Sequence, residues 1–130
     1  MTAKKHILCI EDEAEMIELM RLVLEREGHE VVGAVGGEQG LKLMREKKPD
    51  LILLDLMMPG IDGWEVYRQM RADKELTDIP VIIVTAKAQS IDKVLGLQVA
   101  KVADYITKPF GPKELIGSIE RVFAKQNVRQ

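Results

Sequence analysis

Residues 51–63 read LILLDLMMPGIDG: four apolar residues lead into a single acid, Asp55, and a turn rich in proline and glycine follows. Short apolar runs without polar alternation are typical of strands in a parallel sheet whose two faces are both covered. Asp55 is therefore expected at the end of a buried strand. A carboxylate in that position is costly unless a nearby group compensates its charge, so compensating groups are expected elsewhere in the chain.

Four further apolar runs lie elsewhere in the chain, and patterns of helical period separate them. Strands are expected over 6–10, 30–35, 50–55, 81–86 and 103–107. Helices are expected over 13–27, 37–47, 63–73 and 90–102, and a last one begins at Gly111 and Pro112 and buries Leu115, Ile119, Val122 and Phe123. This alternation predicts a doubly wound α/β fold with a parallel sheet.

The composition suits a single domain over residues 1–130, with 46% hydrophobic and 31% charged residues. The net charge is −2, from 19 basic and 21 acidic residues, which argues against a basic nucleic-acid-binding protein. A lone cysteine, Cys9, cannot form an internal disulfide, and no apolar run is long enough to span a membrane. We expect a cytoplasmic protein, with residues 126–130 as a frayed tail or the start of a linker.

Polar side chains of complementary chemistry lie at the ends of four predicted strands: Glu11 and Asp12, then Asp55, Thr85 and Lys108. The carboxyl ends of parallel strands meet at one edge, where doubly wound folds bind their ligands. Three carboxylates there repel one another unless a cation offsets them, and Mg²⁺ prefers oxygen ligands of this kind. Such a site is suited to phosphoryl transfer with a carboxylate as nucleophile.

Each of these residues also has an ordinary explanation when taken alone. The acids that end the first strand can cap the helix that follows, Thr85 can be a β-branched core residue, and Lys108 can be a solvated surface lysine. Asp55 is harder to explain in this way, because the turn with Pro59 and Gly60 that follows it does not need an acid. The combination of suitable residue types at four strand ends carries the inference.

Four motifs give the chain a family resemblance: CIEDE (9–13), LILLDLMMPGIDG (51–63), VIIVTAKA (81–88) and ADYITKPF (103–110). In this order and spacing the chain resembles the receiver domain of two-component response regulators from about Lys5 to Lys125. The resemblance implies a flavodoxin-like sheet of strand order 2-1-3-4-5 with helices on both faces.

The resemblance also implies a phosphoacceptor and its metal. Asp55 would accept a phosphoryl group from the phosphohistidine of a sensor histidine kinase or a phosphotransfer protein. Mg²⁺, or Mn²⁺, would be held by Glu11, Asp12, Asp55 and the backbone carbonyl of Met57, with Asp12 a more direct ligand than Glu11. Phosphorylation and dephosphorylation would be self-catalysed, so the domain is not expected to be an enzyme in the ordinary sense.

The remaining roles that the resemblance implies concern the response to phosphorylation. Lys108 would pair with the phosphoryl group, ahead of a cis peptide bond to Pro109. Thr85 would move to bond the phosphoryl oxygens, and Tyr105 would turn inward as it does so. Met57 and Lys87 match the variable positions that tune the dephosphorylation rate.

We expect a downstream effector protein to read this change on the face formed by the fourth helix, fifth strand and fifth helix. A homodimer can form there on phosphorylation, and neither nucleic acid nor membrane is expected to bind the domain directly.

The chain departs from the family pattern in three places. Glu11 replaces the commoner aspartate, which keeps the charge and lengthens the side chain. Gly36 and Gly40 stand where relatives often carry a polar residue and an alanine, so the second helix is expected to start weakly. The segment 99–103 is longer than usual, which alters the loop before the fifth strand.

Two other classes of function remain open from the sequence. A phosphatase with an aspartyl intermediate commonly has a second acid two residues after its nucleophile, where this chain has Met57. A binding module on a flavodoxin-like scaffold would have a degenerate site, which the full set of acids, hydroxyl and lysine argues against. His6 and His29 are expected to be ordinary surface residues.

Overall fold

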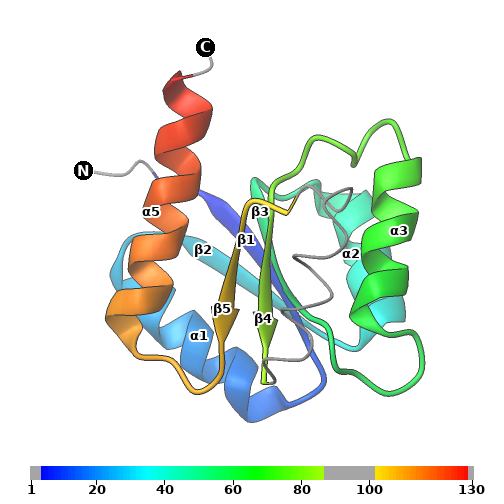
Figure 1. Cartoon of the computed structure of the whole chain (residues 1–130), viewed down its shortest axis with the longest axis horizontal. Coiled ribbons are helices and arrows are strands. Elements are labelled where there is room, and N and C mark those ends of the chain that lie inside the picture. The colour runs from blue at the N-terminus through cyan, green and yellow to red at the C-terminus, as the bar shows by residue number, and fades with distance from the viewer. Residues whose placement is uncertain (1–3, 87–101, 129–130) are drawn as a thin grey trace.

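The computed structural model of the chain describes residues 4–86 and 102–128, and Figure 1 shows their arrangement. The strands are β1 (His6–Glu11), β2 (Glu30–Val35), β3 (Leu51–Asp55), β4 (Val81–Thr85) and β5 (Asp104–Thr107). The helices are α1 (Ala14–Arg26), α2 (Gly37–Lys47), α3 (Gly63–Ala72) and α5 (Pro112–Val128). The helix that the sequence predicts over 90–102 lies, except for Val102, outside the described residues.

All strand pairs are parallel, and the order across the sheet is β2-β1-β3-β4-β5. The predicted doubly wound α/β fold and its strand order are therefore confirmed. The predicted strand ends agree with the observed ones to within one residue. This agreement has a physical cause, because the strands are buried on both faces and their apolar runs stop where the strands leave the core.

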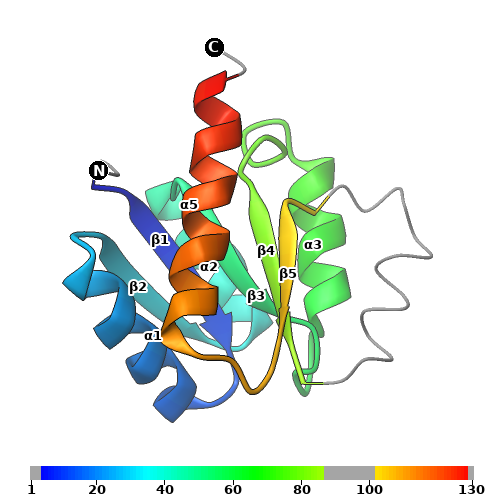
Figure 2. The same ribbon diagram turned by 60° about the vertical axis from the view of Figure 1, so that its left-hand side comes forward.

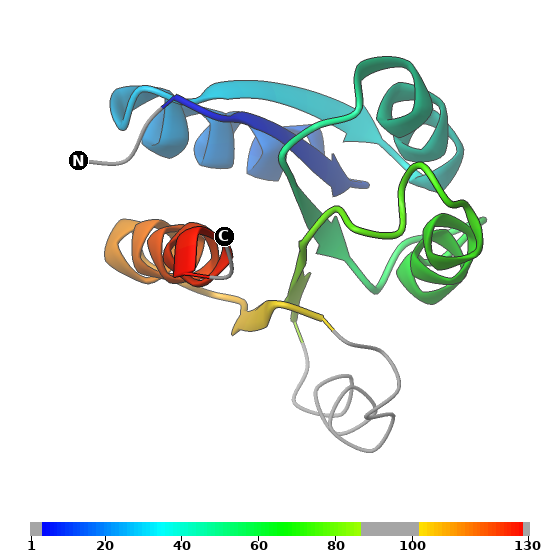
Figure 3. The ribbon, with the colours of Figure 1, turned by 90° about the horizontal axis from the view of Figure 1, so that it is seen from above.

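Helices cover both faces of the sheet. Seen from above, α1 and α5 lie on one side, and α2 and α3 lie on the other (Figure 3). The turned view of Figure 2 shows α5 lying in front of the sheet, with α3 behind it. Two separate clusters of buried side chains result, one on each face. β1 contributes to both of them, with Leu8 and Ile10 facing α2 and α3 and Ile7 and Cys9 facing α1 and α5.

The last helix matches its predicted start and buried face. α5 begins at Pro112, and its buried residues include Leu115, Ile119, Val122 and Phe123. Proline at the first helical position costs no hydrogen bond, because that N–H has no partner within a helix. The helix continues to Val128, into the segment for which the sequence predicts a frayed tail or linker.

The prediction for His29 was wrong. This residue follows Gly28, which has φ of 88° in the turn after α1, and its side chain is buried with 6% exposure. Its Nδ1 accepts a hydrogen bond from the backbone N–H of Lys5 at 3.2 Å, and its ring lies 6.2 Å from that of Phe123. A histidine beside a turn glycine gives no periodic signal, so the sequence pattern did not reveal this burial. His6 is exposed, as predicted, and pairs with Glu30.

Among the described residues, no helix combines the length and the apolar character needed to cross a bilayer.

Candidate functional site

The predicted site residues meet at the carboxyl edge of the sheet. Glu11, Asp55 and Thr85 are the last residues of β1, β3 and β4, Asp12 directly follows β1, and Lys108 directly follows β5. Parallel strands all point the same way, so the residues at their ends share one edge. Each of these side chains therefore owes its place in the site to the topology of the sheet.

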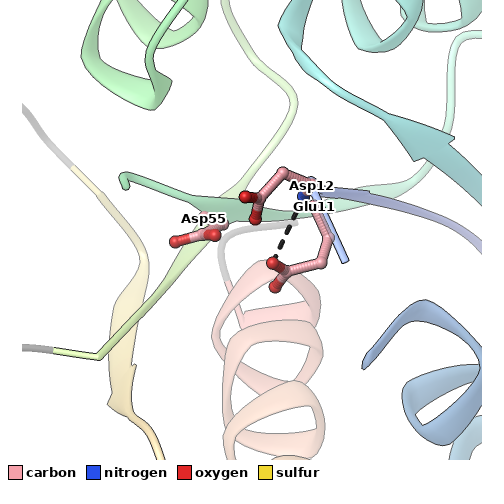
Figure 4. Close-up of side chains that lie close together, drawn as sticks. All are labelled: Glu11, Asp12 and Asp55. Carbon is pink, nitrogen blue, oxygen red and sulfur yellow. Dashed lines mark hydrogen bonds between the residues drawn. The ribbon is translucent and has the colours of Figure 1, made fainter. Parts of the chain in front are cut away.

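Three carboxylates converge there. One carboxylate oxygen from each of Glu11, Asp12 and Asp55 lies within 4.8 Å of the others, and Figure 4 shows the three side chains at the ends of β1 and β3. Glu11 and Asp55 are almost completely buried, with 0% and 3% exposure, and Asp12 is half-buried. Three acids at this spacing form a strongly negative, partly dehydrated pocket.

Lys108 supplies a positive charge to this pocket. Its Nζ lies 2.7 Å from Glu11 Oε2 and 3.6 Å from Asp55 Oδ2, and 13% of its side chain is exposed. Burial alone lowers the pKa of Lys108, but the hydrogen bond that Lys108 donates to Glu11 and the charges of Asp55, Glu11 and Glu13 outweigh burial and raise it. The lysine is therefore a permanent cation of the site.

Glu11 is the acid that resists ionisation most. Burial raises its pKa to about 8, a hydrogen bond and the charge of Asp55 add to the rise, and the contact with Lys108 opposes it. One lysine thus does not neutralise three neighbouring carboxylates. The donor set is entirely oxygen and carries excess negative charge, which fits a hard divalent cation such as Mg²⁺.

The turn after Asp55 fixes the orientation of its carboxylate. Asp55 Oδ1 accepts a hydrogen bond from the backbone N–H of Met57 at 3.0 Å. Asp62 caps α3 by accepting a hydrogen bond from the Glu65 N–H at 2.9 Å, as expected of a short acidic residue at a helix start. Gly63 packs directly against the backbone of Asp55 and Leu56, and a Cβ at that position would collide with Asp55. The glycine therefore lets α3 begin beside the end of β3.

Thr85 lies at this edge with a side chain that is 0% exposed. No hydrogen-bond partner for its Oγ1 occurs in the described part of the chain, while its backbone oxygen accepts from the Lys108 N–H at 2.7 Å. A buried hydroxyl without a partner is unusual and calls for an explanation. It is a donor that a further oxygen ligand in the site can use.

The other predicted site residues lie around this centre. Tyr105 and Met57 are exposed, at 40% and 56% respectively. The peptide bond between Lys108 and Pro109 is cis, as the resemblance implies. Lys87, the second position predicted to tune dephosphorylation, lies outside the described residues.

The direct contact between Lys108 and Glu11 was not foreseen from the sequence. The resemblance pairs the lysine with a phosphoryl group. Strand topology places Lys108 near the three acids but does not indicate which of them it contacts. The longer arm of glutamate compared with aspartate was the one available signal.

Comparisons with known proteins agree with this geometry. A family model described as the response regulator receiver domain matches residues 7–120. The chain is 40% identical over 124 residues to the alkaline phosphatase synthesis transcriptional regulatory protein PhoP of Bacillus subtilis, with 95% of this chain and 50% of that protein covered. It is 42% identical over 118 residues to the DNA-binding response regulator MtrA of Mycobacterium tuberculosis, with 91% and 50% covered.

The solved structure of the Vibrio cholerae chemotaxis protein CheY4 shares the fold, with a TM-score of 0.84 and 24% identity, covering 92% of this chain and 99% of that one. The chain spans about half the length of the curated relatives it matches. The family match nevertheless extends over most of the residues described above, including β2 to β5 and all of β1 except His6. The chain therefore belongs to the response regulator receiver domains of two-component systems.

Proposed function

We propose that this domain is a phosphorylation-activated switch in which Asp55 accepts the phosphoryl group. The observation that carries the proposal is the position of Asp55: a 3% exposed carboxylate grouped with two further acids and within 3.6 Å of a lysine ammonium. A buried acid at a strand end, beside a cation and a buried hydroxyl, is suited to nucleophilic attack on phosphorus.

Asp12 and Asp55 would hold Mg²⁺, or Mn²⁺, together with the backbone carbonyl of Met57, and Glu11 would complete the negative charge around the ion. The bound ion would neutralise charge on the transferring phosphoryl group. The converging carboxylate oxygens support this assignment, because hard divalent cations take oxygen ligands.

The phosphoryl group would come from a phosphohistidine of a sensor kinase or a phosphotransfer protein. A carboxylate oxygen of Asp55 forms a bond to phosphorus as the P–N bond of the phosphohistidine breaks. The electron pair of that bond remains on the imidazole nitrogen. Lys108 lies close enough to pair with the phosphoryl oxygens, and the turn N–H of Met57 holds the other oxygen of Asp55.

The readout of phosphorylation would begin at Thr85. Its buried Oγ1 has no partner in the described part of the chain, so a phosphoryl oxygen on Asp55 offers it a first hydrogen bond. Tyr105 has an exposed ring in the present conformation, and a move of Thr85 would give that ring room to turn inward. Phosphorylation would thereby shift a balance between two conformations of the face that β5 and α5 help to form.

An effector protein, or a second copy of the domain, would read that face. PhoP is named as a transcriptional regulatory protein and MtrA as a DNA-binding response regulator, and each is about twice as long as its matched region. For this domain, with its net charge of −2, we propose protein partners and no direct contact with nucleic acid. A cytoplasmic location would agree with a kinase as phosphodonor.

The first test is intact mass after incubation with acetyl phosphate, with and without Mg²⁺, on the wild type and on Asp55→Asn. We expect the wild type to gain one phosphoryl group only when Mg²⁺ is present, and the variant to gain none. Asparagine keeps the size and the turn hydrogen bond but removes the nucleophilic charge. Circular dichroism of both proteins controls for folding.

Labelling of the folded variant at the wild-type rate would overturn the assignment of Asp55. Steady hydrolysis of a phosphomonoester that depends on Asp55 would instead indicate a phosphatase. A wild type that gains no phosphoryl group from acetyl phosphate or from kinase-bound phosphohistidine would indicate a degenerate binding module.

A further inference from the structure

The contact between Lys108 and Glu11 separates this lysine from the phosphoacceptor. Lys108 Nζ lies 2.7 Å from Glu11 Oε2, the distance of a strong charge-assisted hydrogen bond. Its distance of 3.6 Å from Asp55 Oδ2 is too long for a hydrogen bond. The ammonium therefore belongs to Glu11 in this conformation, although it remains near Asp55.

Glu11 is held in place at both ends of its carboxylate. Oε1 accepts a hydrogen bond from the backbone N–H of Asp12 at 3.2 Å, and Oε2 accepts the one from Lys108. The side chain is 0% exposed, so water does not compete for either oxygen. Both oxygens of Glu11 thus accept hydrogen bonds from donors of the protein itself. Asp12 differs in this respect, because its half-buried carboxylate forms no ion pair in the described part of the chain.

The length of the glutamate side chain makes this contact possible. Aspartate has one methylene less and would end about 1.5 Å short of the present carboxylate position. At that reach the ammonium would lose its hydrogen bond to residue 11. Asp55 would then be the nearest carboxylate to which Lys108 could turn.

We propose that Glu11 is a positioning residue that holds Lys108 away from Asp55 before phosphoryl transfer and yields it to the phosphoryl oxygens afterwards. The inference rests on the proposed role of Asp55 as phosphoacceptor. A hydrogen bond from Lys108 to Asp55 would engage a lone pair that the carboxylate needs for its attack on phosphorus. Held by Glu11, the ammonium leaves Asp55 free and still lies within a short movement of any oxygen added there.

A residue that holds Lys108 and a residue that binds Mg²⁺ can be told apart by which kinetic constant of phosphorylation a substitution changes. Loss of a metal ligand raises the Mg²⁺ concentration needed for half-maximal phosphorylation. Loss of a residue that holds the lysine lowers the maximal rate at saturating Mg²⁺, because Lys108 must first leave Asp55. Glu11→Asp separates the two, since it keeps the carboxyl group and shortens the side chain that carries it.

The experiment compares the wild type, Glu11→Asp and the matched control Glu15→Asp, which makes the same change at an exposed position in the first turn of α1. Metal-free crystal structures give the distances from Lys108 Nζ. Phosphorylation by acetyl phosphate over a range of Mg²⁺ concentrations gives the maximal rate and the half-saturating concentration.

In Glu11→Asp we expect Lys108 Nζ to approach Asp55 Oδ2 to less than about 3.2 Å. The maximal rate should fall about three- to tenfold, the factor that corresponds to one net hydrogen bond. The half-saturating Mg²⁺ concentration should change less than about twofold, and Glu15→Asp should match the wild type in every measurement.

Two results for Glu11→Asp would overturn the inference. One is a crystal structure in which Lys108 stays within hydrogen-bond distance of residue 11 or moves away from both residue 11 and Asp55. The other is a change in the half-saturating Mg²⁺ concentration with no change in the maximal rate. The crystallographic distance does not depend on phosphorylation. A wild type that accepts no phosphoryl group would therefore refute the proposed function and the transfer step, while the distance would still decide whether Glu11 holds the lysine.

Discussion

Glu11 makes the stability of the fold depend on pH. Burial raises the pKa of this carboxyl to about 8 from an ordinary value of 4.5. Between these two values the folded protein keeps a proton that the unfolded chain releases. The stabilisation that results is fully present below pH 4.5, and it is lost as the pH rises through 8.

Glu11→Gln should remove this dependence, because glutamine does not titrate. We expect the free energy of unfolding of the wild type to fall more steeply from pH 5 to pH 8 than that of the variant, by at most about 1.4 kcal/mol per pH unit. Urea unfolding at several pH values in metal-free buffer gives both slopes. Identical slopes would show that Glu11 ionises at its ordinary pKa in the folded protein.

At the scale of residues, the sequence predicted which side chains share the site but not which of them touch. Asp12, Asp55 and Lys108 could be placed at one edge because a parallel sheet brings strand ends together. The 2.7 Å contact between Lys108 and Glu11 depends on the rotamers of two long side chains, about which a sequence pattern carries no information. The Thr85 hydroxyl, which has no hydrogen-bond partner among residues 4–86 and 102–128, was not predicted for the same reason.

At the scale of elements, the start of α2 shows why a weak helix former can be required. Gly36 is the residue before the helix, with φ of 96°, and as a glycine it provides no side-chain hydrogen bond to the first helical turn, in keeping with the expected weak start. Gly40, however, packs against β1: a Cβ added there would lie 2.6 Å from Ile10 Cδ1 and 2.8 Å from its Cγ1. The glycine allows the helix to approach the sheet over the side chain of Ile10.

Gly40→Ala should therefore destabilise the protein although alanine favours helices. The collision with Ile10 costs about 1–3 kcal/mol, against a gain of about 1 kcal/mol in helix propensity. Gly117→Ala is the matched control, because among the described residues a Cβ at this position of α5 meets only the end of the Arg121 side chain, at 3.2 Å.

We expect Gly117→Ala to stabilise by about 0.5–1 kcal/mol, so the two substitutions should move the urea midpoint in opposite directions. A Gly40→Ala variant as stable as Gly117→Ala would mean that Ile10 repacks without cost.

Helices and strands could be predicted where burial of one face gives the apolar residues a regular spacing in the sequence. α2 begins and ends at the predicted residues, 37 and 47, and α3 ends one residue before the predicted boundary. The helix predicted over 90–102 stays a prediction, because it lies almost wholly outside the described residues. His29 was not predictable in this way, because it is a single polar residue and its contacts with Lys5 and Phe123 join segments far apart in the sequence.

At the scale of the whole molecule, His29 connects the beginning of the chain to its last helix. The His29 ring packs near Phe123 of α5, Lys5 donates its backbone N–H to His29 Nδ1, and the Lys5 ammonium lies 5.1 Å from the Phe123 ring centroid. This contact joins the turn after α1, the approach to β1 and α5, three segments far apart in the sequence. The face on which effectors are proposed to act includes α5, so the charge state of His29 bears on how firmly that helix is held.

His29 stabilises the fold only while it is neutral. Its Nδ1 accepts a hydrogen bond, which a protonated Nδ1 cannot do. Burial lowers its pKa from the ordinary 6.5, Glu27 and Glu120 oppose that shift, and Lys5 reinforces it. Folding thus favours the neutral imidazole of His29, and the resulting stabilisation is fully present above pH 6.5. It declines as the pH falls below 6.5 towards the lower pKa of the folded state.

His29→Gln should abolish this decline, since an amide oxygen can accept the Lys5 hydrogen bond and does not titrate. The free energy of unfolding of the wild type, relative to that of the variant, should fall between pH 7 and pH 5 by at most about 1.4 kcal/mol per pH unit. The comparison with the variant cancels the opposite effect of Glu11.

His6→Gln is the control, because His6 is the other of the two histidines and its side chain is 62% exposed. If His6→Gln removed the decline and His29→Gln left it unchanged, the buried ring would not be the group that senses pH.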